Sequence, residues 1–216
     1  MADAELLTVR GHLRLVEPEH APIERSSQGT GMVDPDAGRS QALHWRLPDV
    51  DKEMRADLSR QQPCVLWLTG LSEAETSTIA NLVESELYAL GRHTYLLDGD
   101  NVQRGLNRDL GFSNADRAEN IRRVAEVAKL MVDAGLIVLA TISPLREDRQ
   151  DAHDLFEHEE FIEIFVDTPL PIAGVDAAYE APENPDVRID TTAHCPRDAA
   201  WLILDEHCRR QLIALP

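Results

Sequence analysis

Apolar and polar residues follow two repeating patterns along most of the chain, and these patterns predict its secondary structure. Five short apolar runs predict β-strands, at residues 64–69, 94–97, 136–142, 161–166 and 187–190. Four longer segments repeat apolar residues at helical spacing and predict helices, at residues 76–90, 114–134, 146–157 and 197–212. Because strands with nearly continuous apolar runs are buried on both faces, this order predicts an α/β fold. We expect a parallel sheet of about five strands with helices on both faces.

The first 60 residues show no such repeating pattern, apart from a charged segment that predicts a short helix at residues 51–60. Residues 26–38 are rich in serine, glycine, aspartate and proline, a composition typical of turns and linkers. We therefore expect residues 1–42 to form a poorly ordered extension or the remnant of a linker. Residues 43–216 are expected to form a single domain.

Composition narrows the class of protein. A chain of 216 residues with 43% hydrophobic residues can bury one core, and its formal net charge of −18 argues against nucleic acid or an anionic membrane as a partner. The longest apolar run, residues 135–142, is too short to span a bilayer, and the N-terminus does not resemble a secretory signal. The three cysteines form no CxxC pair, which favours reduced thiols over a zinc site or disulfides. We expect a cytoplasmic protein.

The turn between the first predicted strand and its helix resembles a phosphate-binding loop that has lost its chemistry. Gly70 and Ser77 stand at the spacing of the GxxxxGK[ST] motif, but Glu75 replaces the second glycine and Thr76 replaces the lysine. In that motif the lysine supplies positive charge to the β- and γ-phosphates, and the glycine lets backbone N–H groups close on them. Here the carboxylates of Glu73 and Glu75 are expected to face the place where a polyanion would sit.

Further motifs resemble those of adenylyl-sulfate (APS) kinases closely, over about residues 43–207. They comprise residues 67–72, 77–82, 94–102, 105–113, 115–117, 119–124, 134–139, 142–144, 161–163, 165–170 and 179–185. Residues 40–52 resemble the linker of bifunctional sulfate-activation proteins of the rhizobial nodulation type, in which a GTPase subunit of ATP sulfurylase precedes the kinase. The resemblance implies a P-loop kinase-like fold.

The same resemblance implies an activity and its partners. APS kinases move the γ-phosphate of ATP to the 3′-hydroxyl of APS, giving PAPS, with Mg²⁺ as the metal. APS and PAPS would therefore be ligands, and sulfate adenylyltransferase subunits or a second copy of the chain are candidate protein partners. ATP binding is expected on the altered loop, at Gly70, Leu71, Ser72, Glu73, Ala74, Glu75, Thr76, Ser77 and Thr78.

Three residues would serve the reaction centre if the resemblance holds. The hydroxyl of Ser77 would be a ligand of Mg²⁺. Asp98, at the end of the second predicted strand, would orient the attacking hydroxyl or a metal-bound water, although an aspartate there is also a good turn or helix cap. We expect Asp98 and Ser77 to lie within a few ångströms, at the carboxyl ends of adjacent strands. Ser143 falls at the family's phosphoserine position, but direct in-line transfer needs no such intermediate.

Six residues would contact APS by the same resemblance: Asp100, Asn101, Arg104, Phe112, Arg117 and Asn120. Phe112 would stack on the adenine, with a place in the core as its alternative. Arg117 and Asn120 stand one helical turn apart and would hold the phosphosulfate and the ribose. For Arg117 the alternative is an ordinary solvated helix face.

Departures from the family pattern indicate that catalysis is impaired. Besides the altered loop, the long segment that closes over both nucleotides in the family is missing between Leu170 and Gly174. A unit charge at ~4 Å contributes roughly 4 kcal/mol at an effective dielectric of about 20, equivalent to about three decades in rate. We therefore expect weak or no kinase activity and better binding of APS than of ATP. The alternative is a non-catalytic pseudokinase that binds APS or PAPS or interacts with another protein.

Overall fold

The computed structural model describes residues 49–142, 146–157, 159–168 and 179–210 of the chain. Within these ranges the order of the elements is α2 Lys52–Ser59, β1 Cys64–Gly70, α3 Glu73–Ala89, β2 Thr94–Asp98, α4 Gly99–Arg104, α5 Asn114–Asp133, β3 Ile137–Thr141, α6 Arg146–His153, β4 Phe161–Asp167, β5 Val187–Asp190 and α7 Pro196–Arg209. The predicted extension at residues 1–42 lies outside the described residues. Among the described helices, none has the length and apolar content needed to cross a membrane.

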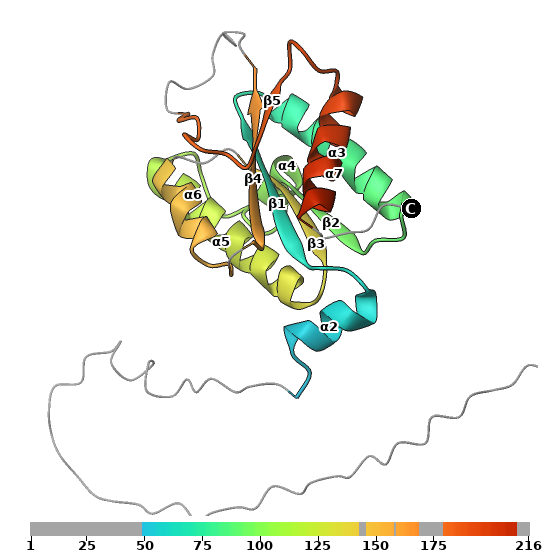
Figure 1. Cartoon of the computed structure of the whole chain (residues 1–216). Coiled ribbons are helices and arrows are strands. Elements are labelled where there is room, and N and C mark those ends of the chain that lie inside the picture. The colour runs from blue at the N-terminus through green and yellow to red at the C-terminus, as the bar shows by residue number, and fades with distance from the viewer. Residues whose placement is uncertain (1–48, 143–145, 158, 169–178, 211–216) are drawn as a thin grey trace, which may run out of the picture. The chain divides into compact units, whose positions relative to one another are not determined.

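The five strands form one sheet in the order β2-β3-β1-β4-β5, and every neighbouring pair is parallel. Figure 1 shows this sheet with β1 at its centre. The α/β fold with a parallel five-stranded sheet is thus confirmed. The prediction that the strands before Gly70 and at Asp98 are adjacent is wrong, because β3 lies between β1 and β2. Both strands that pair with β1, namely β3 and β4, come more than 60 residues after it along the chain, so sequence proximity is a poor guide to neighbours here.

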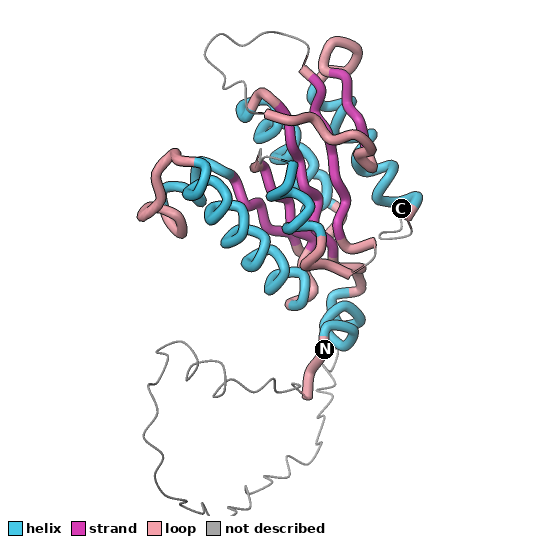
Figure 2. Tube along the Cα trace, turned by 90° about the vertical axis from the view of Figure 1, so that its left-hand side faces the viewer, coloured by secondary structure: helices cyan, strands magenta, loops and turns pink. Residues whose placement is uncertain are grey.

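Side chains of β1 alternate between two cores. Leu66 and Leu68 belong to a core formed with α3 and α7, whereas Val65 and Trp67 belong to a second core formed with α5 and α6. Every residue of β1 is buried, which explains why the sequence runs continuously apolar there. Figure 2 shows helices on both sides of the strands. The carboxyl ends of β1, β2 and β3 are thereby held at one edge of a rigid layer.

Helix α3 begins at Glu73, three residues earlier than predicted, and this shift falls on the altered loop. Ser72 is its N-cap and accepts a hydrogen bond from the backbone N–H of Glu75 at 3.4 Å. Alanine and glutamate at positions 74 and 75 favour a helix more than glycine does. Glu75, which stands in place of the motif's second glycine, therefore lies within α3 and not in the turn before it.

Candidate functional site

Two side chains from different elements meet at the carboxyl edge of the sheet. Ser77 of α3 donates its hydroxyl hydrogen to Asp98 Oδ2 at 2.7 Å. Asp98 ends β2 and also caps α4, because its Oδ1 accepts from the backbone N–H of Asn101 at 3.2 Å. The hydroxyl of Thr141, the last residue of β3, lies 3.5 Å from Asp98 Oδ2. The predicted proximity of Ser77 and Asp98 is confirmed, and Asp98 is a helix cap as well.

The turn from β1 into α3 needs glycine at position 70. A Cβ atom at Gly70 would lie 2.6 Å from the backbone O of Val166 on β4, a distance that no side chain tolerates. Leu71 and Ser72 follow, both half-buried, before the helix begins. Close packing against β4 therefore explains why this glycine remains although Glu75 replaces the motif's second glycine.

Thr76, which stands where the motif needs lysine, is 1% exposed. Its backbone N–H and its hydroxyl both donate to the backbone O of Ser72, at 3.0 and 3.3 Å. Thr78 makes the same kind of bond two residues further on, from its hydroxyl to the backbone O of Ala74 at 2.6 Å. The hydroxyls of Thr76 and Thr78 thus bond to carbonyls of their own helix, and neither residue adds positive charge.

Glu75 reaches out of the helix to the end of β4. Its Oε2 accepts a hydrogen bond of 2.5 Å from the hydroxyl of Thr168, which is 6% exposed. Thr168 Oγ1 in turn lies 3.4 Å from the hydroxyl of Thr191, just after β5. The side chain of Glu73 is not among those described. The carboxylate of Glu75 therefore links the first turn of α3 to the β4 and β5 side of the sheet.

The predicted APS contacts lie on α4, on α5 and in the turn between them. Asp100, Asn101 and Arg104 of α4 are exposed. Phe112 is 81% exposed, so its alternative place in the core is ruled out. Arg117 and Asn120 lie in the first half of α5 and are half-buried. We call this region, residues 99–123, the substrate platform. Ser143 and residues 169–178, where the closing segment is shortened, lie outside the described residues.

Residues that the sequence analysis did not select hold the platform in place. Arg123 of α5 donates to both carboxylate oxygens of Asp109, at 2.8 and 2.9 Å. Hydrogen bonds from Arg123 lower the pKa of Asp109 below its usual range, and Arg122 and Arg123 lower the pKa of Glu119 to about 2. Asn107, 0% exposed, donates to Asn120. Because Arg123 and Asp109 are 14 positions apart, no local sequence pattern could have revealed their contact. Asn107 could have been selected, because it lies within residues 105–113, a segment that resembles the family.

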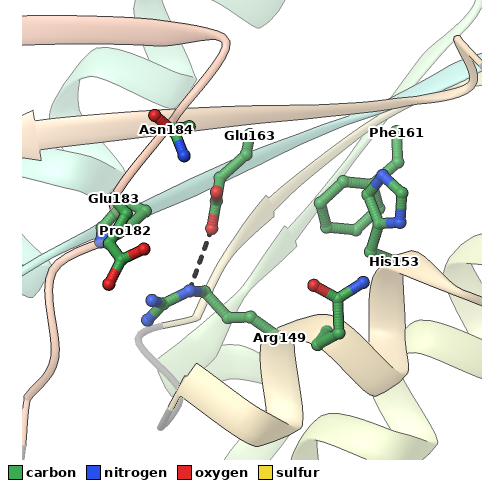
Figure 3. A pocket seen from close by; sticks show the side chains of 8 residues that line it. Arg149, His153, Phe161, Glu163, Pro182, Glu183 and Asn184 are labelled. Atoms are coloured by element: carbon green, nitrogen blue, oxygen red, sulfur yellow. Dashed lines mark ion pairs between the residues drawn. The ribbon is translucent and has the colours of Figure 1, made fainter.

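A pocket of about 180 Å³ lies between α6, β4 and residues 182–184 (Figure 3). Within it Arg149 of α6, 4% exposed, forms an ion pair with Glu163 of β4, with 2.9 Å between Nε and Oε1. Burial raises the pKa of Glu163 even though the charge of Arg149 lowers it. This ion pair fastens α6 to the sheet, and the pocket shares no residue with the predicted site.

Comparison with known proteins gives a consistent result. A family model described as adenylylsulphate kinase matches residues 62–173. The bifunctional enzyme NodQ of Rhizobium meliloti (strain 1021) is 49% identical over 212 residues, which cover 88% of this chain and 33% of that protein. The adenylyl-sulfate kinase of Vibrio parahaemolyticus serotype O3:K6 is 44% identical over 198 residues, which cover 82% of this chain and 97% of that protein.

Solved structures agree with these relatives. The structure of the Mycobacterium tuberculosis APS kinase CysC in complex with AMPPNP and APS matches with a TM-score of 0.61 and 39% sequence identity. The match covers 68% of this chain and 98% of that one. The chain spans about a third of the length of the bifunctional relatives it matches, at 33% of NodQ, and nearly the whole of the Vibrio kinase, at 97%.

Proposed function

We propose that this chain, which belongs to the adenylylsulphate kinase family, binds APS in sulfate assimilation but has little or no phosphotransfer activity. One observation carries the proposal: Thr76, at the position of the phosphate-binding lysine, is buried and bonded to Ser72 within its own helix. No rotation of a threonine side chain could bring positive charge to a triphosphate. The family reaction needs such charge, because phosphoryl transfer relies on positioning and electrostatic stabilisation.

Support for APS as the ligand comes from the substrate platform. Phe112 is exposed enough for an adenine ring to stack on it, and base–aromatic stacking contributes roughly 1–3 kcal/mol per base. Arg117, on the first turns of α5, carries the positive charge that a phosphosulfate needs. The structure of the Mycobacterium tuberculosis relative is titled as a complex with both AMPPNP and APS. We extend only APS binding to this chain.

ATP fits the altered loop poorly. Backbone N–H groups of residues 75 and 76 are bonded to Ser72, and the carboxylate of Glu75 adds negative charge beside the turn. A carboxylate near a polyphosphate costs several kcal/mol at the effective dielectric of about 20 that applies near protein surfaces. ATP affinity is therefore expected to be lower than APS affinity.

Mg²⁺ is the metal that the family implies, and the residues present fit it only in part. The Ser77 hydroxyl and the Asp98 carboxylate, 2.7 Å apart, are oxygen ligands of the kind Mg²⁺ prefers. Mg²⁺ in kinase sites also takes oxygens from substrate phosphates. Among the described residues no group of three His, Cys, Asp or Glu side chains could hold a metal ion. When bound, the ion would neutralise phosphate charge. Asp98 would keep its own role of orienting the hydroxyl of APS.

Isothermal titration calorimetry with APS and, separately, with ATP·Mg²⁺ tests the proposal. We expect APS to bind and ATP·Mg²⁺ to bind more weakly. A coupled assay for PAPS on the same sample is expected to give no turnover above background. Equal or tighter ATP binding, or robust PAPS formation, would overturn the proposal. A chain that binds neither nucleotide would contradict APS binding.

A protein partner is a second candidate role. The relatives described as bifunctional enzymes are three times as long as the matched region, since that region covers 33% of NodQ. We extend to this chain the idea that an APS-binding domain works beside a sulfate adenylyltransferase, or as a homodimer. Size-exclusion chromatography with light scattering, with and without purified sulfate adenylyltransferase subunits, tests it. A monomer under both conditions would leave only APS binding.

A further inference from the structure

Asn107 is a completely buried amide in the turn between α4 and α5. Its Nδ2 lies 2.5 Å from Oδ1 of Asn120 and 3.5 Å from the backbone O of Asn120. The backbone of Asn107 also belongs to the turn, since its N–H donates to Val102 and its carbonyl accepts from Leu110, both at 3.0 Å. The side chain therefore joins an ordered turn to the middle of the substrate platform.

The backbone oxygen of Asn120, 3.5 Å from Nδ2 of Asn107, favours one orientation of both amides, which leaves Oδ1 of Asn107 buried without a hydrogen-bond partner among the described residues. A carbonyl oxygen only accepts, so the group of Asn107 that faces it is the NH₂ group. The same NH₂ group faces the side-chain amide of Asn120, which must then present its oxygen. The NH₂ group of Asn120 is the opposite end of that amide, and it makes no hydrogen bond to another residue within the described ranges.

We propose that Asn107 is a positioning residue: it fixes Asn120 as a hydrogen-bond donor toward the ligand. The inference rests on the proposed function, APS binding at the substrate platform. An asparagine that is free to flip offers either a donor or an acceptor, whereas a fixed one accepts only the complementary partner. Asn120 thus selects oxygen acceptors, such as those of a phosphate, a sulfate or a ribose. Asn107 is 0% exposed and acts only through Asn120.

The surroundings of the pair favour a fixed amide. The turn that carries Asn107 is also held from outside, because Arg123 binds Asp109 and donates to the backbone O of Leu106 at 3.4 Å. A donor that is already oriented loses less conformational entropy when the ligand binds. Arg117, one helical turn before Asn120 on α5, adds positive charge of the sign that an acceptor-rich ligand needs.

Two isosteric substitutions test the orientation without any ligand. In Asn120→Asp the new carboxylate still accepts from the NH₂ group of Asn107, so the melting temperature should stay within about 2 °C of the unmodified chain. In Asn107→Asp the donor is lost and a buried carboxylate faces the backbone O of Asn120. This should lower the melting temperature by roughly 4–10 °C or prevent folding.

Asn81→Asp, on the exposed face of α3, is the matched control for added charge in this acidic chain. Its melting temperature should not change. A loss in Asn120→Asp that equals or exceeds that in Asn107→Asp would show that the amides face the other way. Two unchanged melting temperatures would show that the contact fixes nothing. Either result overturns the proposal.

A double-mutant cycle on APS affinity tests the action through Asn120. Removing Asn107 by Asn107→Ala should weaken APS binding roughly fivefold in the unmodified chain, but less than twofold in an Asn120→Ala background. A purely structural role would give the same loss in both backgrounds, which would overturn the proposal. If the unmodified chain does not bind APS, the proposed function fails instead, and the melting temperatures still decide how the amides face.

Discussion

The start of α3 carries the predicted ATP contacts and the substrate platform carries the predicted APS contacts, and the polar groups of the two regions are bonded differently. At the start of α3, Thr76 bonds to Ser72 and Glu75 bonds to Thr168, so the groups that would face a phosphate are satisfied within the protein. On the platform, contacts between side chains hold the turn in place, while Phe112 is left 81% exposed.

The difference separates structural order from readiness to bind. Both regions are well held, but the described side chains at the start of α3 bond within the protein, whereas the platform leaves Phe112 exposed. Satisfying a polar group internally removes the unpaired donors that make a helix N-terminus attractive to an anion. The platform instead uses buried or paired residues such as Asn107 and Asp109 to support exposed ones. The altered loop therefore keeps the strand–turn–helix fold of a phosphate loop, and the proposed loss of ATP binding is a separate property that titration tests.

The largest effect is expected from restoring the phosphate-binding motif at the start of α3, which should raise ATP affinity. The triple variant Glu73→Gly, Glu75→Gly and Thr76→Lys returns backbone donors and positive charge, so ATP affinity should rise at least about 100-fold. Turnover should stay well below that of the family, because the segment between Leu170 and Gly174 remains short and APS is poorly aimed. Calorimetry and a coupled assay for PAPS measure the two effects.

The double variant Glu73→Gly and Glu75→Gly, which leaves Thr76 in place, is the control for that experiment. It removes negative charge but adds no positive charge, so its ATP affinity should lie between that of the unmodified chain and that of the triple variant. Full turnover in the triple variant would mean that the closing segment is dispensable.

The second largest effect is expected on the substrate platform, where removing the exposed ring of Phe112 should weaken APS binding. Phe112→Ala should lower APS affinity roughly tenfold, because the loss of one stacked base costs roughly 1–3 kcal/mol. Stability should hardly change, since the ring is 81% exposed. Tyr88→Ala, which removes a ring that is 77% exposed on α3, is the matched control and should leave APS affinity unchanged. Equal losses in both variants would show that Phe112 is no ligand platform.

A smaller effect is expected from breaking the hydrogen bond between Glu75 of α3 and Thr168 at the end of β4. Thr168→Val removes the donor to Glu75 and leaves a partly buried carboxylate without it, at a cost of roughly 1–3 kcal/mol. The melting temperature should fall by roughly 2–8 °C, as measured by differential scanning calorimetry. In Glu75→Gln, where an amide replaces the charge, the fall should be smaller and ATP affinity should rise. A larger fall in Glu75→Gln than in Thr168→Val would contradict this.

The smallest effect is expected from weakening the ion pair between Asp109 and Arg123, which holds the platform from outside. Asp109→Asn keeps the shape of the side chain but removes one charge from the pair with Arg123, and exposed pairs contribute little, so APS affinity should fall less than about threefold. Because the folded-state pKa of Asp109 is lowered, the contribution of this pair is present above pH 3.8 and is lost as the pH falls further. Titrations between pH 6 and pH 8 should therefore give the same ratio of affinities. A ratio that varies across this range would exclude Asp109 as the cause.

Local patterns in the sequence determined the class of fold and its elements, except for helix α4, which was not predicted. The continuous apolar run of β1 predicted a strand buried on both faces, and the loss of the motif lysine at Thr76 was readable from spacing alone. Helix α3 was predicted, but its start was placed too late. The predicted start assumed a loop, whereas Ser72 and the residues after it form a capped helix.

The proximity of Ser77 and Asp98 was expected from the sequence, but the tertiary structure decided the other contacts between these residues. Strand β3 separates β1 from β2, yet Ser77 of α3 still reaches Asp98 across that arrangement. Glu75 and Thr168 are 93 positions apart, and Asn107 and Asn120 are 13 apart across a turn. Such pairs leave no period in the sequence, because their distance depends on how whole helices and strands pack. The chain alone thus determined what each segment becomes, and the packing of the segments determined which polar groups are satisfied and which remain available to a ligand.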